Sequence, residues 1–136
     1  MKEGKSNMST IINQEIHFKV SSNRLYEALT DASKFSVVTG GAPTEIGAEE
    51  GDSFSLFGGM ITGRNIELVP NERIVQAWRA GNWEPGVYSI AKFEFKDNGD
   101  ETQLVFTHIG YPEGQGEHLG TGWHENYWKP LEKYFA

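Results

Sequence analysis

Between residues 45 and 109, apolar and polar side chains alternate in short runs that are separated by turn residues. Alternating side chains point to opposite faces of a β-sheet, so each run predicts a strand. We expect strands over residues 53–57, 60–69, 73–79, 87–96 and 102–109. Because connections this short join antiparallel neighbours, the segment is predicted to form an antiparallel meander.

The strongest turn signal of the meander is the segment Asp97-Asn98-Gly99-Asp100. An Asn-Gly pair favours a tight hairpin in which both central residues have positive φ. Gly58-Gly59 and Pro70-Asn71 end two other strands. At these positions the chain is expected to reverse direction between neighbouring strands.

One strand and two short helices precede the meander. Residues 11–20 are β-branched and roughly alternating, which favours a strand. Residues 21–23 (Ser-Ser-Asn) offer N-cap oxygens for a short helix through residue 30. Asp31 or Ser33 could open a second short helix.

The last segment changes its period and predicts an amphipathic helix. Its apolar stripe, with a spacing of four, consists of Leu119, Trp123, Tyr127 and Leu131. Trp128 widens the stripe. Pro130 removes the hydrogen bond to the carbonyl of Asn126, so a kink or a break is expected there.

These elements predict an α+β domain in which a curved antiparallel sheet wraps around the long C-terminal helix. The apolar face of such a sheet must be covered by another element, and the aromatic stripe of the last helix is large enough to cover it. We expect residues 1–10 to form a polar, flexible tail and residues 11–136 to form a single domain. A length of 136 residues fits one such domain.

Composition excludes several classes of protein. The formal net charge is −7, from 12 Lys plus Arg and 19 Asp plus Glu, and no basic run offers a phosphate-binding surface for nucleic acid. The chain has no cysteine, hence no disulfide or thiolate site, and no apolar stretch long enough to span a membrane. No secretory signal precedes the domain, so we expect a cytoplasmic protein.

Alternation also assigns an inward face to each strand. The residues expected to line a cleft between the sheet and the last helix are Phe54, Gln76, Trp78, Phe93, Phe106, His108, Trp123 and Tyr127. They either fill the core or leave an apolar pocket with a few polar groups. Gln76 and His108 on the buried side favour a pocket, since buried polar groups need partners.

His108 is the third inward position of its strand, which predicts a partly buried imidazole near the rim of the sheet. It is either a hydrogen-bonded structural histidine or a general base. As a base it should lie beside a second polar group such as Gln76 or Tyr88. Trp83, in the loop over residues 80–86, either folds onto the sheet edge or stands at a pocket mouth or a partner surface.

Metal ligands and cofactor motifs are not expected. His118 and His124 are six residues apart on the last helix and lie on different faces. The pair His124-Glu125 begins like a zinc-protease helix but lacks the second histidine four residues after the first. We therefore predict no catalytic residue, no metal and no cofactor.

Several segments match one known family in the same order along the chain. They are Tyr26–Thr30, Gly51, Phe54, Gly63, Leu68–Pro70, Arg73–Arg79, Trp83, Gly86, Gly122-Trp123, Tyr127-Trp128 and Pro130-Leu131. Over residues 11–135 the chain thus resembles the domain shared by activators of the heat-shock protein 90 ATPase and their small bacterial homologues. That family is similar to the START-like (SRPBCC) superfamily, so the resemblance implies the helix-grip fold of the birch-pollen-allergen type.

Three functions are compatible with these observations. The first is a non-enzymatic domain that binds a small apolar or amphipathic ligand in the cleft. The resemblance implies a second, a stress-related co-chaperone module that binds a chaperone; the eukaryotic activators dock through a separate N-terminal domain, and this chain is expected to hold the C-terminal type alone. START-like relatives imply a third, a cyclase or hydratase-type enzyme. A monomer or a weak dimer is expected.

Overall fold

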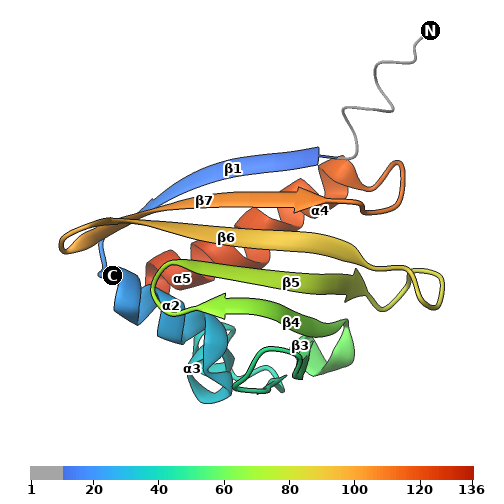
Figure 1. The fold of residues 1–136 in the computed structure, drawn as a ribbon, viewed down its shortest axis with the longest axis horizontal. Coiled ribbons are helices and arrows are strands. Elements are labelled where there is room, and N and C mark those ends of the chain that lie inside the picture. The colour runs from blue at the N-terminus through green and yellow to red at the C-terminus, as the bar shows by residue number, and fades with distance from the viewer. Residues whose placement is uncertain (1–10) are drawn as a thin grey trace, which may run out of the picture.

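The computed structural model describes residues 11–136, so the tail predicted for residues 1–10 lies outside the described residues. Seven antiparallel strands form one sheet in the order β1-β7-β6-β5-β4-β3-β2 (Figure 1). They are β1 (Ile11–Phe18), β2 (Glu45–Ile46), β3 (Ser53–Leu56), β4 (Ile61–Val69), β5 (Arg73–Ala80), β6 (Ser89–Asn98) and β7 (Glu101–Ile109). The meander is confirmed, and β1 pairs with the last strand of the chain.

Two short helices follow β1, as the sequence predicts. α2 (Ser22–Thr30) begins after Ser21, whose side chain accepts a hydrogen bond from the Arg24 amide. α3 (Ala32–Val38) begins after Asp31, whose carboxylate accepts from the Lys34 amide at 2.9 Å. Asp31, rather than Ser33, is therefore the cap that opens the second helix.

The C-terminal helical segment crosses one face of the sheet (Figure 1). It comprises α4 (Gly116–Trp123), the π-helical turn η2 (His124–Trp128) and α5 (Lys129–Tyr134). In an α-helix, residues five apart point about 140° away from each other, whereas a π turn brings them onto one side. Trp123 and Trp128 accordingly stack, with ring centroids 5.6 Å apart and an interplanar angle of 22°.

The π turn also explains why Pro130 does not break the helix. The Lys129 amide donates to the carbonyl of His124, five residues back, and the backbone stays right-handed helical at Trp128 and Lys129. Pro130 then lies in the first turn of α5, where an amide proton is not needed. The expected break is replaced by a widened turn.

The hairpin between β6 and β7 differs from the predicted one. Asn98 pairs with Glu101, so the two loop residues are Gly99 and Asp100. Gly99 has a φ of 76°, and Asn98 is not among the residues with positive φ. A two-residue hairpin with glycine first matches a type II′ turn, in which one central residue alone needs positive φ.

The core lies between the sheet and the C-terminal helical segment. Phe106 sits at its centre, with ring centroids 4.2 Å from Trp123 and 5.2 Å from Trp128. The α+β helix-grip prediction is confirmed by this arrangement of sheet and helix. Within residues 11–136, no helix has the length and apolar character needed to cross a bilayer.

Candidate functional site

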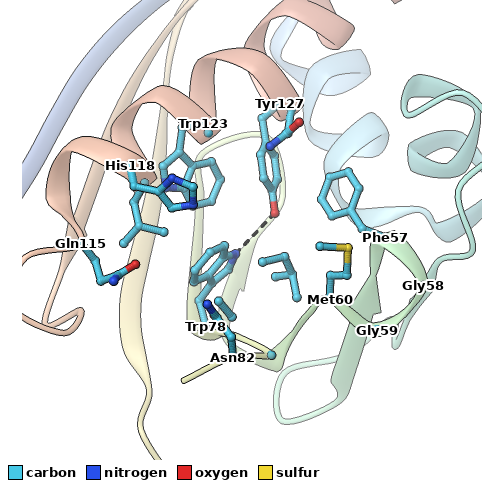
Figure 2. Close-up of a pocket in the computed structure, with 16 residues that line it drawn as sticks. Phe57, Gly58, Gly59, Met60, Trp78, Asn82, Gln115, His118, Trp123 and Tyr127 are labelled. Carbon is cyan, nitrogen blue, oxygen red and sulfur yellow. Dashed lines mark hydrogen bonds between the residues drawn. The ribbon is translucent and has the colours of Figure 1, made fainter. Parts of the chain in front are cut away.

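A cavity of about 670 Å³ opens between α4 and the sheet (Figure 2). The far wall comes from the 3-10 turn η1 (Phe57–Gly59), the start of β4 and the end of β5. The near wall comes from α4 and the π turn η2. The sixteen lining residues are Phe57, Gly58, Gly59, Met60, Ile61, Trp78, Ala80, Gly81, Asn82, Gln115, His118, Leu119, Gly122, Trp123, Asn126 and Tyr127.

Aromatic side chains make up the deep wall of the cavity. The Trp78 ring on β5 lies 5.4 Å from Trp123, tilted by 36°, and Trp123 lies 4.1 Å from Tyr127. The Trp78 indole N–H donates to the Tyr127 hydroxyl over 3.4 Å. All three residues are at least 95% buried, so the wall is fixed by packing on both sides.

Phe57 closes the other side and has an unusual backbone. Its φ is 54°, in the left-handed region that bulky residues seldom adopt. Its ring packs on Tyr127 at 5.8 Å and on Phe35 of α3 at 5.9 Å, and these contacts hold the conformation. Backbone strain of this kind concentrates at ligand sites, so η1 is a candidate part of a ligand site and does more than connect β3 to β4.

The rim of the cavity is polar but carries little charge. Gln115, the residue before α4, lies at the rim with His118 and Asn126 of the helical segment, and the loop after β5 contributes Asn82. Met60 lies among them and is 70% exposed. Within the described chain, His118 is the one lining residue with an ionisable basic side chain. The rim can orient a polar group, and the deep wall can accept an apolar one.

The structure brings three of the eight predicted residues to this cavity: Trp78, Trp123 and Tyr127. Phe54, Gln76 and Phe93 instead surround a separate void of about 10 Å³, which Tyr127 also borders. Phe106 and His108 are fully buried and line neither space.

His108 does not lie at a half-open rim, which corrects the sequence prediction. It is 0% exposed, because Tyr111 in the loop after β7 packs against it at 5.3 Å and Trp78 covers it at 5.0 Å. Tyr88 is 51% exposed, and the hydrogen-bond partners of the imidazole are other residues. The general-base arrangement with Gln76 or Tyr88 is therefore not formed.

Hydrogen bonds satisfy both nitrogens of His108 and assign its tautomer. The Trp123 indole, which can only donate, gives its proton to Nδ1 at 3.0 Å. Nε2 therefore carries the proton and donates to the Ser89 hydroxyl at 2.7 Å, and that hydroxyl donates to the Trp78 carbonyl at 2.8 Å. Burial lowers the pKa of His108 to about 3. The residue is a neutral structural link from helix to sheet.

Trp83 folds onto the sheet rather than standing at the cavity mouth. It is 8% exposed and packs edge-on against Trp78 at 5.7 Å. Among residues 11–136, no three His, Cys, Asp or Glu side chains gather closely enough to hold a metal ion.

Sequence reasoning missed the residues of the far wall and the rim. Gln115, His118, Gly122 and Asn126 lie beside the predicted stripe at helical spacing, so a wider reading of the same periodicity could have found them. Phe57 and Met60 come from a turn whose path depends on tertiary packing, and no local pattern marks them.

Comparison with known proteins relates this geometry to one family. The family model described as "Activator of Hsp90 ATPase homolog 1-like protein" matches residues 19–136. The "Activator of 90 kDa heat shock protein ATPase homolog 1" of Homo sapiens is 29% identical over 119 residues, which cover 88% of this chain and 35% of that protein. The Dictyostelium discoideum homolog is 37% identical over 89 residues, 65% of this chain and 23% of that protein. The chain thus spans about a third or less of these relatives.

Solved structures show the same fold. The crystal structure of an HSP90 activator from Plasmodium falciparum has a TM-score of 0.87 and 27% identity, and the match covers 92% of this chain and 95% of that one. The solution structure of the Aha1 dimer from Colwellia psychrerythraea has a TM-score of 0.76 and 22% identity, over 92% and 95% of the two chains. With the family model matching nearly the whole described chain, the protein belongs to the Activator of Hsp90 ATPase homolog 1-like family.

Proposed function

We propose that this domain is a non-enzymatic binding module that holds one small apolar or amphipathic molecule between α4 and η1. The observation that carries the proposal is the cavity of about 670 Å³, whose deep wall is aromatic. Ligand sites in proteins typically measure roughly 300–1,000 Å³ and combine apolar walls with a few polar groups. Protein interiors otherwise pack as densely as organic crystals, so an aromatic-walled space of this size is a favourable place for an apolar ligand.

The chemistry of the lining supports binding rather than catalysis. The His108 imidazole, which was the candidate base, points into the core. Both of its nitrogens are hydrogen-bonded, to Trp123 and to Ser89. Of the eight residues proposed from the sequence as ligand contacts, Trp78, Trp123 and Tyr127 remain as direct contacts in this proposal. Leu119 and Phe57 extend the apolar surface on either side.

Gly122 offers a direct test of ligand binding. It lines the cavity, and a Cβ added there would meet the Asn126 amide at an ordinary 3.7 Å. Gly122→Leu should therefore occupy the part of the cavity beside Trp123 and obstruct a ligand there without straining the helix. Thr121→Leu adds a similar side chain at the neighbouring exposed position and is the matched control.

The measurement is the shift of the melting temperature with naphthalene, 1-decanol and palmitate. A ligand at 100 times its Kd should stabilise the folded state by about 2.7 kcal/mol. We expect at least one of the three to shift the wild type and Thr121→Leu, and Gly122→Leu to lose that shift. If none of the three shifts the wild type, or if Gly122→Leu responds as strongly, the cavity is not a ligand site.

A second candidate function is binding to a chaperone of the heat-shock protein 90 class. It is favoured by the family and by the Plasmodium falciparum HSP90 activator, a chain of which 95% is covered by the match. The test is the ATPase rate of the heat-shock protein 90 from the same organism, with and without this protein. A rise that saturates with concentration would support a co-chaperone role, and an unchanged rate with no complex at high micromolar concentration would remove it.

A further inference from the structure

The Tyr127 hydroxyl is a buried donor without an acceptor. Tyr127 is 5% exposed, and its hydroxyl points into the cavity toward Trp78 (Figure 2). The one hydrogen bond it makes within residues 11–136 comes from the Trp78 indole, which donates to the phenol oxygen. An indole N–H cannot accept, so the phenol proton is left facing the cavity.

This proton stays on the oxygen under ordinary conditions. Burial raises the pKa of Tyr127 far above its usual value, and the hydrogen bond from Trp78 opposes that effect only in part. The phenol is therefore neutral and available as a donor. A buried donor without a partner is costly, so a ligand that supplies an acceptor at this point gains affinity over one that does not.

The lining also restricts the charge of the ligand. None of the described lining residues is Asp, Glu, Lys or Arg, and His118 is exposed at the rim. A carboxylate or an ammonium group beside Tyr127 would lose its hydration without gaining an ion pair, which is strongly unfavourable.

The walls restrict its shape. Trp78 and Trp123 pack against each other, tilted by 36° with ring centroids 5.4 Å apart, and Phe57 stands on the opposite side of the cavity, next to Tyr127. A cavity with aromatic side chains on both sides suits a flat, apolar body. On the basis of the binding function proposed above, we propose that the ligand is a neutral, flat aromatic molecule whose carbonyl oxygen accepts the Tyr127 hydroxyl proton at the deep wall.

Three naphthalene derivatives separate these requirements. 2-Acetylnaphthalene carries the carbonyl acceptor, 2-isopropenylnaphthalene has nearly the same shape with C=CH₂ in place of C=O, and 2-naphthoate carries a charge. Titration calorimetry of the full chain gives the three affinities. A neutral hydrogen bond predicts that the ketone binds about five- to tenfold more tightly than the alkene. The naphthoate should bind at least about tenfold more weakly than the ketone.

Tyr127→Phe removes the donor and keeps the ring. We expect the affinity ratio of ketone to alkene to fall to within about twofold of one, with alkene affinity retained. Tyr111→Phe is the matched control, because Tyr111 is also buried with an unpartnered hydroxyl but lies outside the cavity. It should keep the wild-type ratio. The ratio is measured within one variant, so a loss of stability in Tyr127→Phe does not disturb it.

The outcomes distinguish the two proposals. If ketone and alkene bind the wild type equally well, or if Tyr127→Phe keeps the preference, the carbonyl inference is wrong and the binding function stands. If the naphthoate binds best, the neutral-ligand inference is wrong. If no derivative binds and naphthalene, 1-decanol and palmitate also give no shift, the binding function itself fails and this inference fails with it.

Discussion

At the scale of single residues, His108 shows how a polar group inside the core is kept neutral. Its Nδ1 faces a donor in Trp123, and its Nε2 donates to Ser89. A second proton would have to be placed on Nδ1, opposite the indole N–H. Burial and the fixed tautomer therefore act in the same direction, and the pKa of His108 falls to about 3.

This lowered pKa makes the stability of the protein depend on pH. An unfolded histidine has a pKa of about 6.5. Below that pH, His108 binds a proton in the unfolded chain but not in the folded one. The stabilising contribution is fully present above pH 6.5 and declines as the pH falls toward about 3. By pH 5 the loss from His108 alone should be about 2 kcal/mol.

His108→Gln provides the comparison, because the glutamine amide offers both a donor group and an acceptor group but does not titrate. Urea unfolding of both proteins between pH 7.5 and pH 5 gives the two curves. All other titratable groups are shared, so the difference between the curves isolates His108. We expect the wild type to lose about 2 kcal/mol more than the variant, and parallel curves would contradict the assignment.

The sequence predicted which way individual side chains face, but not how deeply they are buried. Alternation placed Gln76 and Trp78 inward, and both are buried. It also placed His108 inward, which is correct. The prediction that His108 lies partly exposed at the rim of the sheet is wrong, because Tyr111 in the loop after β7 covers it. Periodicity reports the side of a strand, and covering by distant segments is a tertiary property.

At the scale of elements, β4 carries a glycine that the sheet cannot replace. Gly63 pairs with Phe54 on β3 and with Trp78 on β5. A Cβ at this position would overlap the carbonyl oxygen of Ala77 and the ring of Phe54. Phe54 is 3% exposed and lies over the space that the glycine leaves. The absent side chain allows the Phe54 ring to approach the backbone of β4 closely.

Gly63→Ala should therefore destabilise the protein by at least about 3 kcal/mol, since neither the neighbouring backbone nor a buried ring can move freely. Gly81→Ala is the control, because its Cβ would meet its nearest atom, the Met60 carbonyl oxygen, at 3.4 Å. It should change stability by less than about 0.5 kcal/mol. Denaturant midpoints at a constant m-value measure both, and equal midpoints for the two variants would contradict the close approach.

Sequence patterns predicted the elements better than their ends. The bounds of β4, β5 and β7 agree with the expected runs to within one residue. The two-residue edge strand β2 was not expected as a separate strand, since two residues cannot show a period. The Gly99 turn is shifted by one residue because type II′ and type I′ hairpins share the same residue types, and the pairing of the flanking strands decides between them.

At the scale of the whole molecule, the cavity runs along α4 and η2 and does not extend to α5. A cleft was expected between the sheet and the helix, and Trp123, Trp128 and Phe106 fill part of that space. Space remains where α4 passes η1 and the loop after β5. Such a location depends on how far the sheet curves around the helix, which no local pattern records.

Gln14 on β1 ties the first strand to the last helical segment. The Trp128 indole donates to its Oε1 at 2.6 Å, and its Nε2 donates to the Gly120 carbonyl at 3.1 Å. Trp128 is 1% exposed, so its N–H has no access to water if Gln14 is lost. This one side chain closes the sheet around the helix by joining segments more than a hundred residues apart in the sequence.

Gln14→Met keeps the shape of the side chain and removes both hydrogen bonds. Leaving a buried indole N–H unpaired should cost about 1–3 kcal/mol, measured by urea unfolding. Gln103→Met is the matched control, because Gln103 donates to Glu15 at 2.8 Å on the exposed side of the neighbouring strand, where water can replace the bond. It should cost less than about 0.5 kcal/mol. In a Trp128→Phe background the donor is absent, so Gln14→Met should there cost at least about 1 kcal/mol less. The same cost in both backgrounds would show that Gln14 acts by packing alone and does not anchor the helix through Trp128.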